Sequence, residues 1–322
     1  MSDKFVYQNA RVKSMESSLF TAQSVGRLLD CTSAQSAFRA LLDMGFGAGT
    51  SVEDGNFDAL FAYEEEKAAE FLHEFNVDGA LDAFLIQYDF LNLKALFKSG
   101  VTGKAAVLAP EGLYNKDDIK SWIEQDGASD APEVISSAIS ELKALAQDGK
   151  VSPHAVDCIV DKAMFRVILG GRNKKFGKDV TQYFVRKADG MNISAFLRCK
   201  RLGLSRQYFE EGFIEGGELN FLPEIYEAPL DTLKEKCRRT AYDEAVKQLV
   251  DDGNLVAFEV SEDNALLKMW KDGKDDLFSI SPIVAFYLTK ITQIRVAKLA
   301  VAGIKNGVEQ GKIKERMREL YA

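Results

Sequence analysis

The chain has 322 residues, a formal net charge of −8 at pH 7 and 46% hydrophobic residues. This length suits one large domain or two to three small ones, and the acidic balance argues against a general nucleic-acid-binding surface. Only six prolines accompany 21 phenylalanines, a composition that favours long, closely packed helices.

The first residues, Met1–Lys4, lack the basic-then-apolar layout of a secretion signal, so we expect a cytoplasmic protein. The uncharged runs are shorter than the ~18 apolar residues that a membrane span needs, so any membrane connection is expected to pass through a partner. The four cysteines form no C-x-x-C pair and are expected to be reduced thiols.

In chain order, apolar residues every three or four positions over 12–29 predict a first long helix. Thr32 or Ser33 is the expected N-cap of a second helix, which ends near Gly45. The glycines at 45, 47 and 49 predict a helix-helix loop, because a phosphate cradle would need a preceding strand.

Helical spacing recurs over 57–74, and Asp78 is the expected N-cap of the helix that follows. The same rhythm appears over 155–168 and 233–250. Residues 255–260 have strand character but no partner strand, so we expect a helix or an extended connector there.

The last long helix is expected to begin at Ser281-Pro282, because proline suits the first helical turn. Its predicted course passes through Val301. The tail that follows, over residues 312–318, is basic and amphipathic, and a solvated helix end is its simplest interpretation.

One amphipathic stretch recurs along the chain. Asp89-x-x-Asn92 and Asp189-x-x-Asn192 open two copies that lie 100 residues apart, and Gln293 stands for the asparagine in a looser third copy. Three spaced copies predict a triplicated unit. The fold class that follows is all-α, with helical repeat units over 1–116, 117–220 and 221–322.

Residues that could perform catalysis are scarce. His154 and Cys158 lie one helical turn apart, but no second pair with zinc-ligand spacing accompanies them. The run Gly100–Ala105 lacks both the spacing of a phosphate loop and its metal-binding hydroxyl. We therefore expect no catalytic residues, cofactor or metal, although a generic helical scaffold and an all-helical enzyme with an unrecognised site both stay open.

A basic cluster closes the middle copy: Arg198, Lys200, Arg201 and Arg206. Cations at a helix C-terminus stabilise that end of the helix, which is one explanation. The alternative is a docking patch for an acidic partner. These four residues are the candidate partner-binding site.

The run from Asn192 to Ser205, with the Gly216-Gly217 turn, resembles the C subunits of A/V-type ATPases, which are relatives of the d subunit of eukaryotic V-ATPases. The opening over 7–16 and the close over 282–318 resemble the same family, so the similarity covers essentially the whole chain. Gln293 departs from the pattern of the other two copies. The first copy also carries only two lysines where the middle copy has its basic cluster.

The resemblance implies a funnel of three similar helical bundles in a pseudo-threefold arrangement. It implies a non-catalytic rotor subunit that links the central stalk to the membrane proteolipid ring, and so couples ATP hydrolysis or synthesis to ion translocation. A peripheral position on the cytoplasmic face of the membrane would follow. Nucleic acid is not among the expected partners.

Overall fold

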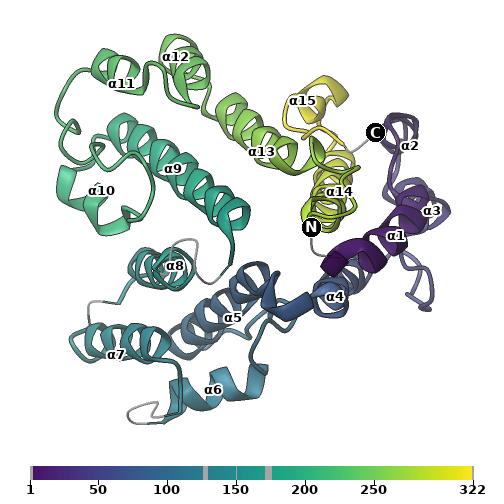
Figure 1. The fold of residues 1–322 in the computed structure, drawn as a ribbon, viewed down its shortest axis with the longest axis horizontal. Coiled ribbons are helices and arrows are strands. Elements are labelled where there is room, and N and C mark those ends of the chain that lie inside the picture. Colours follow the sequence, from purple (N-terminus) through teal and green to yellow (C-terminus); the bar gives the residue numbers. More distant parts are fainter. Residues whose placement is uncertain (1–2, 126–129, 150, 171–175, 321–322) are drawn as a thin grey trace. The chain divides into compact units, whose positions relative to one another are not determined.

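A computed structural model describes residues 3–125, 130–149, 151–170 and 176–320, and within these ranges the chain forms helices and connecting segments without strands (Figure 1). The α-helices are α1 Val6–Met15, α2 Ala22–Leu29, α3 Ala34–Asp43, α4 Phe57–Phe75, α5 Asp82–Thr102, α6 Lys116–Glu124, α7 Glu133–Gln147, α8 Pro153–Leu169, α9 Lys178–Arg201, α10 Arg206–Gly212, α11 Leu230–Cys237, α12 Asp243–Asp252, α13 Leu255–Lys271, α14 Ser281–Lys305 and α15 Gln310–Lys314. The all-α prediction is confirmed for these ranges.

The chain divides into two compact units. Unit 1 joins the two ends of the chain, Met1–Asp78 and Glu259–Ala322, whereas unit 2 is the continuous segment Gly79–Phe258. The boundary between them falls inside α13. The three-repeat division, with boundaries near 116 and 220, stays a prediction.

Helix α14 is the central element of unit 1, where it packs against α1, α2, α3, α4 and α15. The core that it shares with the N-terminal helices is rich in aromatic rings. Phe71 of α4 lies 5.0 Å from Phe286 of α14, centroid to centroid, and Phe38 meets Phe57 edge to face at 5.2 Å. Both termini are thus tied into one core.

Helix α8 holds the corresponding position in unit 2, in contact with α5, α7, α9 and α10. Figure 1 shows α8 between α5 and α9. Ser152 caps α8 by accepting the amide of Ala155 at 3.1 Å, and Pro153 occupies the first turn. This start matches the preference of helices for a hydroxyl cap followed by proline.

Several predicted helices are confirmed. Ser33 is the cap of α3, Phe57–Phe75 forms α4, and Pro282 lies in the first turn of α14. The strand-like segment 255–260 begins the helix α13. Asn254 accepts the amide of Ala257, which starts the helix in spite of the β-branched residues.

Three boundaries differ from the prediction. The single helix over 12–29 is wrong: α1 ends at Met15, and Thr21 caps α2 with a reciprocal bond to Ser24. The N-cap role of Asp78 is wrong as well, because its backbone is left-handed (φ 51°) and α5 starts only at Asp82. The rhythm over 233–250 is broken at Arg239, whose φ of 67° interrupts the helix between α11 and α12.

Candidate interaction surface

The acids of the repeated stretch are buried and accept backbone amides. Asp89 accepts the N–H groups of residues 113–114 at 2.9 and 3.1 Å. Asp189 accepts those of 218–219 at 3.0–3.1 Å, and also the hydroxyl of Tyr242 at 3.0 Å. Each carboxylate therefore holds a connecting segment further along the chain: residues 113–114 lie between α5 and α6, and residues 218–219 lie between α10 and α11.

The asparagines hold the same segments at a second point. Asn92 donates to the carbonyl of Pro110 at 2.9 Å and accepts the amide of Ala109 at 2.8 Å. Asn192 both donates to and accepts from the backbone of Ile214, at 2.8 and 2.9 Å. The two copies thus repeat one hydrogen-bond arrangement, which we call the clamp, and it explains why the Asp-x-x-Asn spacing recurs.

Glycine allows the clamped segments to approach the acids. A Cβ atom at Gly112 would collide with the Asp89 carboxylate, and one at Gly217 would collide with Asp189. Neither glycine has a positive φ. Glycine is therefore needed at these positions because it has no side chain, and not because of its backbone freedom. Burial raises the pKa of Asp89 to about 6 and raises that of Asp189, although amide donors oppose the shift at both.

The third copy does not form this clamp. Thr289 and Thr292, 100 residues after Asp189 and Asn192, donate to carbonyls of their own helix at 2.7 and 2.8 Å. Gln293 corresponds to the buried apolar Ile193 in this alignment. Among the residues that the structure describes, neither polar atom of its fully buried side chain has a hydrogen-bond partner. The expectation that Gln293 takes the asparagine's place is therefore wrong.

Two members of the basic cluster make contacts inside unit 2. Lys200 donates to the carbonyls of Tyr226 and Ala228 at 2.6 and 2.9 Å. The guanidinium of Arg201 donates to the carbonyl of Gly253, where α12 ends. Each side chain therefore donates hydrogen bonds to backbone carbonyls of unit 2, and neither is only a solvated charge.

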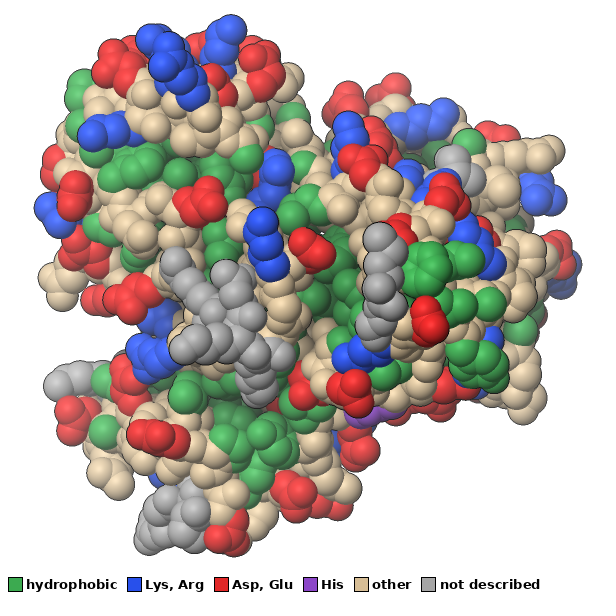
Figure 2. Space-filling model, viewed as in Figure 1, with side chains coloured by type: hydrophobic (Ala, Val, Ile, Leu, Met, Phe, Trp, Pro, Cys, Tyr) green, Lys and Arg blue, Asp and Glu red, His purple; other side chains and the backbone are tan. Residues whose placement is uncertain are grey.

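The other two members are exposed, as Arg201 is. Arg198 is exposed on α9, and Arg206 pairs with Glu210 one turn along α10 at 2.7 Å. Figure 2 shows basic and acidic side chains interspersed over the face in view. The docking role of the four residues stays a prediction, and the exposed Arg198 and Arg206 are the two best suited to a test by charge reversal.

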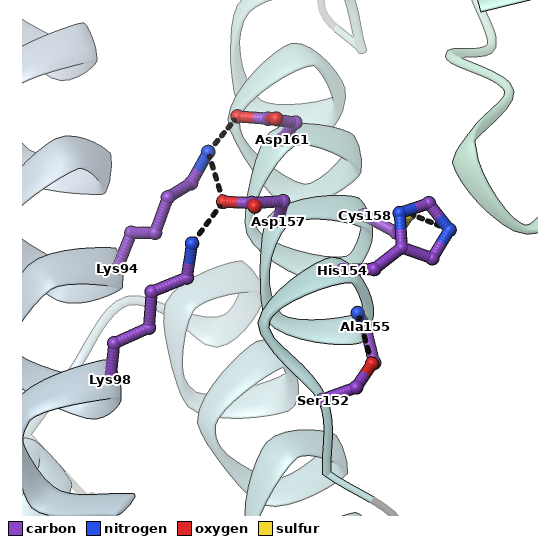
Figure 3. Close-up of polar contacts among 8 residues, drawn as sticks. All are labelled: Lys94, Lys98, Ser152, His154, Ala155, Asp157, Cys158 and Asp161. Atoms are coloured by element: carbon purple, nitrogen blue, oxygen red, sulfur yellow. Dashed lines mark hydrogen bonds and ion pairs between the residues drawn. The ribbon is translucent and has the colours of Figure 1, made fainter. Parts of the chain in front are cut away.

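The lysines of the first copy join α5 to α8. Lys94 contacts Asp157 and Asp161 at 3.2 and 2.8 Å, and Lys98 contacts Asp157 at 2.7 Å (Figure 3). Burial favours the neutral form of Asp157, but its hydrogen bonds with the two lysines lower its pKa overall. These pairs explain the contact between the two helices at this point.

The His154–Cys158 pair lies on another side of α8 (Figure 3). The His154 Nε2 and Cys158 Sγ atoms are 3.4 Å apart, and the imidazole stacks on Tyr208 with a centroid distance of 4.3 Å. Both residues line a cleft of about 660 Å³ between α7, α8 and α10. Burial raises the pKa of Cys158 to about 11, which disfavours the thiolate that metal binding requires.

Within the described ranges, no three His, Cys, Asp or Glu side chains form a group that could hold a metal ion. Among the helices so described, none is long and apolar enough to cross a membrane. Sequence reasoning missed the clamps themselves and the role of Tyr242, which lies 53 residues after Asp189. The repeated Asp-x-x-Asn spacing was the available signal for the clamps, but nothing in the sequence marked Tyr242.

Comparison with known proteins gives a consistent result. Residues 8–316 match a family described as ATP synthase (C/AC39) subunit. The C subunit of the V-type sodium ATPase of Enterococcus hirae is 21% identical over 83% of this chain and 84% of its own length. The C subunit of the A-type ATP synthase of Pyrococcus abyssi is 22% identical over 98% of this chain and 90% of its own length.

Proposed function

This chain belongs to the ATP synthase (C/AC39) subunit family, and from that premise we propose that it is a rotor component of a V/A-type rotary ATPase. Within such a complex it is a structural subunit, not a catalytic one. It links the central stalk to the membrane proteolipid ring, and so couples ATP hydrolysis or synthesis to ion translocation. The proposal includes a funnel of three helical bundles, with the protein peripheral on the cytoplasmic face of the membrane.

The observation that carries this proposal is the extent of the family match, which runs from residue 8 to residue 316. A match of that length runs from within α1 to beyond the end of α15, so it is not a likeness confined to one motif. It favours a rotary ATPase subunit over an unrelated helical scaffold.

The packing of both units suits a part that transmits torque. Close-packed interiors are poorly compressible, so aromatic cores such as that around Phe71 and Phe286 resist deformation. The clamps of Asp89 and Asp189 tie the connecting segments to the helices as well. Rigid helices joined by fixed connectors pass on a rotation instead of absorbing it.

The direct test is binding of the purified chain to a reconstituted central stalk and, separately, to the detergent-solubilised proteolipid ring. Binding to both supports the linking role. A well-folded chain that binds neither contradicts the proposal, and binding to only one partner contradicts the link while leaving membership of the complex intact.

Charge reversal tests the basic cluster within this function. Arg198→Glu with Arg206→Glu is expected to weaken binding to an acidic partner by about tenfold, with a marked dependence on salt. The matched control is Lys104→Glu with Lys247→Glu, which makes the same charge change at two other exposed cations. If both double variants bind the partner with equal affinity, the basic cluster is not part of the interface.

A further inference from the structure

The cleft of about 660 Å³ in unit 2 is a groove along one face of α8. Most of its lining comes from α8, and α7 and α10 lie on either side (Figure 1). The α8 residues that line it recur every three or four positions, over a length of about 16 Å or about three helical turns. They are Ala155, Cys158, Ile159, Lys162, Ala163 and Arg166.

Contacts with α8 hold both walls of the groove. On the α10 side, the ring of Tyr208 stacks on His154 at 4.3 Å, and Lys162 donates to the carbonyl of Glu210 at 3.1 Å. On the α7 side, Ala138 is buried where the two helices pack. A groove that is already formed loses little conformational freedom when it binds a partner.

The middle of the groove is apolar. Ile159 of α8 and Leu145 of α7 are half-buried and line it. The alanines at 138, 155 and 163 line it as well, and their side chains end at the Cβ atom. Small residues let another helix approach closely, so the groove suits the apolar side chains of an added helix.

Each wall of the groove carries an exposed carboxylate, Glu141 on α7 and Glu211 on α10. Within the part of the chain that the structure describes, neither side chain forms a hydrogen bond or an ion pair. Two carboxylates on opposite walls attract basic side chains on both flanks of an occupant.

The two cations of the groove do not oppose this pattern. Lys162 already donates to the carbonyl of Glu210. Arg166 lies near the end of α8, whereas Glu141 lies level with the middle of α8, because the short connection between α7 and α8 makes them antiparallel neighbours. At that end of the groove, Arg166 suits the partial negative charge at the C-terminus of a bound helix.

We propose that this groove docks an amphipathic helix of a partner protein. The helix places apolar side chains against α8, basic side chains beside Glu141 and Glu211, and its C-terminal end beside Arg166. An apolar stripe with basic residues on both flanks complements a groove with a carboxylate on each wall. Docking here is an additional role, which involves unit 2 alone and does not depend on the proposed rotor function.

Two synthetic helical peptides test the groove. Both carry leucines at every third or fourth position, and they differ only in their flanks, which are lysine in one and glutamate in the other. Fluorescence anisotropy with the full chain is expected to show at least tenfold tighter binding of the lysine peptide. Binding of neither peptide, or equal binding of both, would overturn the proposal.

Charge reversal separates the groove from the general acidity of the chain. Glu141→Lys with Glu211→Lys is expected to weaken binding of the lysine peptide at least tenfold and to strengthen binding of the glutamate peptide. The matched control, Glu224→Lys with Glu235→Lys, makes the same charge change at two exposed glutamates outside the groove. Equal effects of the two double variants, both shown by circular dichroism to be folded, would exclude the groove as the binding site.

Photo-crosslinking identifies the natural occupant. Benzoylphenylalanine in place of Leu145 is expected to crosslink, in the cells that make the protein, to a helical segment with basic residues beside apolar ones. Crosslinking of the added lysine peptide at the same position is the positive control. Crosslinks to a small molecule, to a non-helical segment or to a second copy of this chain would each contradict the proposal, as would the absence of a crosslink.

Discussion

Gln293 is a side chain whose chemistry does not match its surroundings. It is fully buried in α14, and within the described part of the chain neither its amide nitrogen nor its carbonyl oxygen has a hydrogen-bond partner. The equivalent positions in the other copies hold Leu93 and Ile193, both apolar. A buried polar group without a partner costs stability, because it has lost its bonds to water.

Replacement of Gln293 by leucine is therefore expected to stabilise the protein by about 1–3 kcal/mol. The measurement is the free energy of unfolding in urea. The reciprocal variant, Ile193→Gln, is the matched control and is expected to destabilise by a similar amount, because it buries a new amide. A loss of stability in Gln293→Leu would contradict the assignment of this amide as an unsatisfied group.

Asp89 makes the stability of the protein depend on pH. Burial raises its pKa to about 6, whereas an aspartate in an unfolded chain titrates near 3.9. Between these values the folded state binds more protons than the unfolded state. The stabilisation that comes from protonated Asp89 is therefore full below pH 3.9 and is lost as the pH rises through about 6. At higher pH the stability no longer depends on this group.

This effect is measured as the difference in unfolding free energy between the wild type and Asp89→Asn. The difference is expected to fall by up to about 3 kcal/mol between pH 4 and pH 6.5, since one pKa unit corresponds to about 1.4 kcal/mol. The comparison cancels the titration of all other groups. A difference that stays constant across this range would contradict the raised pKa.

At the scale of single elements, the clamps show how α5 and α9 hold connecting segments that come later in the chain. Asp89 and Asn92 bind four backbone groups of 109–114, and the middle copy repeats this arrangement. A connecting segment held in this way needs a residue without a side chain where it passes the acid. Gly112 and Gly217 meet that need.

The variants Gly112→Ala and Gly217→Ala are each expected to destabilise the protein by about 2 kcal/mol or more, because the new methyl group displaces the clamped backbone from its carboxylate. Thermal unfolding followed by circular dichroism gives the measurement. Gly100→Ala is the control: it lies in α5, and no atom of the described residues lies within 4 Å of its added Cβ, so a gain of about 0.5–1 kcal/mol is expected. If all three variants have similar melting temperatures, the clamps do not contribute to stability.

At the scale of the whole molecule, the two units differ in how the chain builds them. Unit 2 is one continuous segment, whereas unit 1 needs both ends of the chain, since α14 packs against α1 to α4. A continuous segment with its own core can fold by itself. Two halves of a shared core cannot do so separately.

A fragment of residues 79–258 is thus expected to unfold cooperatively with helical circular dichroism. A fragment of residues 1–78 alone is expected to remain largely unfolded, because it lacks the apolar face of α14. Addition of residues 259–322 should restore its helicity. A fragment 1–78 that folds alone would mean that α14 is not needed for that core.

The helical class, most helix positions, the repeated Asp-x-x-Asn stretch and the family resemblance could all be predicted without the structure. Those features depend on local spacing and on residue type, both of which can be read along the chain. The sequence also indicated which basic residues are unusual, through the density of charge over 198–206. The alignment of Gln293 with Asn192, at an offset of 101, was wrong. It paired two side chains of similar chemistry that lie in different environments.

The contacts of the polar residues in the repeat could not be predicted in this way, because they depend on how the helices pack. Asp189 reaches Tyr242 across 53 residues, and Arg201 reaches Gly253 across 52. Such bonds depend on how distant helices pack, which no short-range pattern encodes. The same packing buries Asp189 and leaves Met191 exposed on one helix, because burial is decided by the neighbours of each side chain.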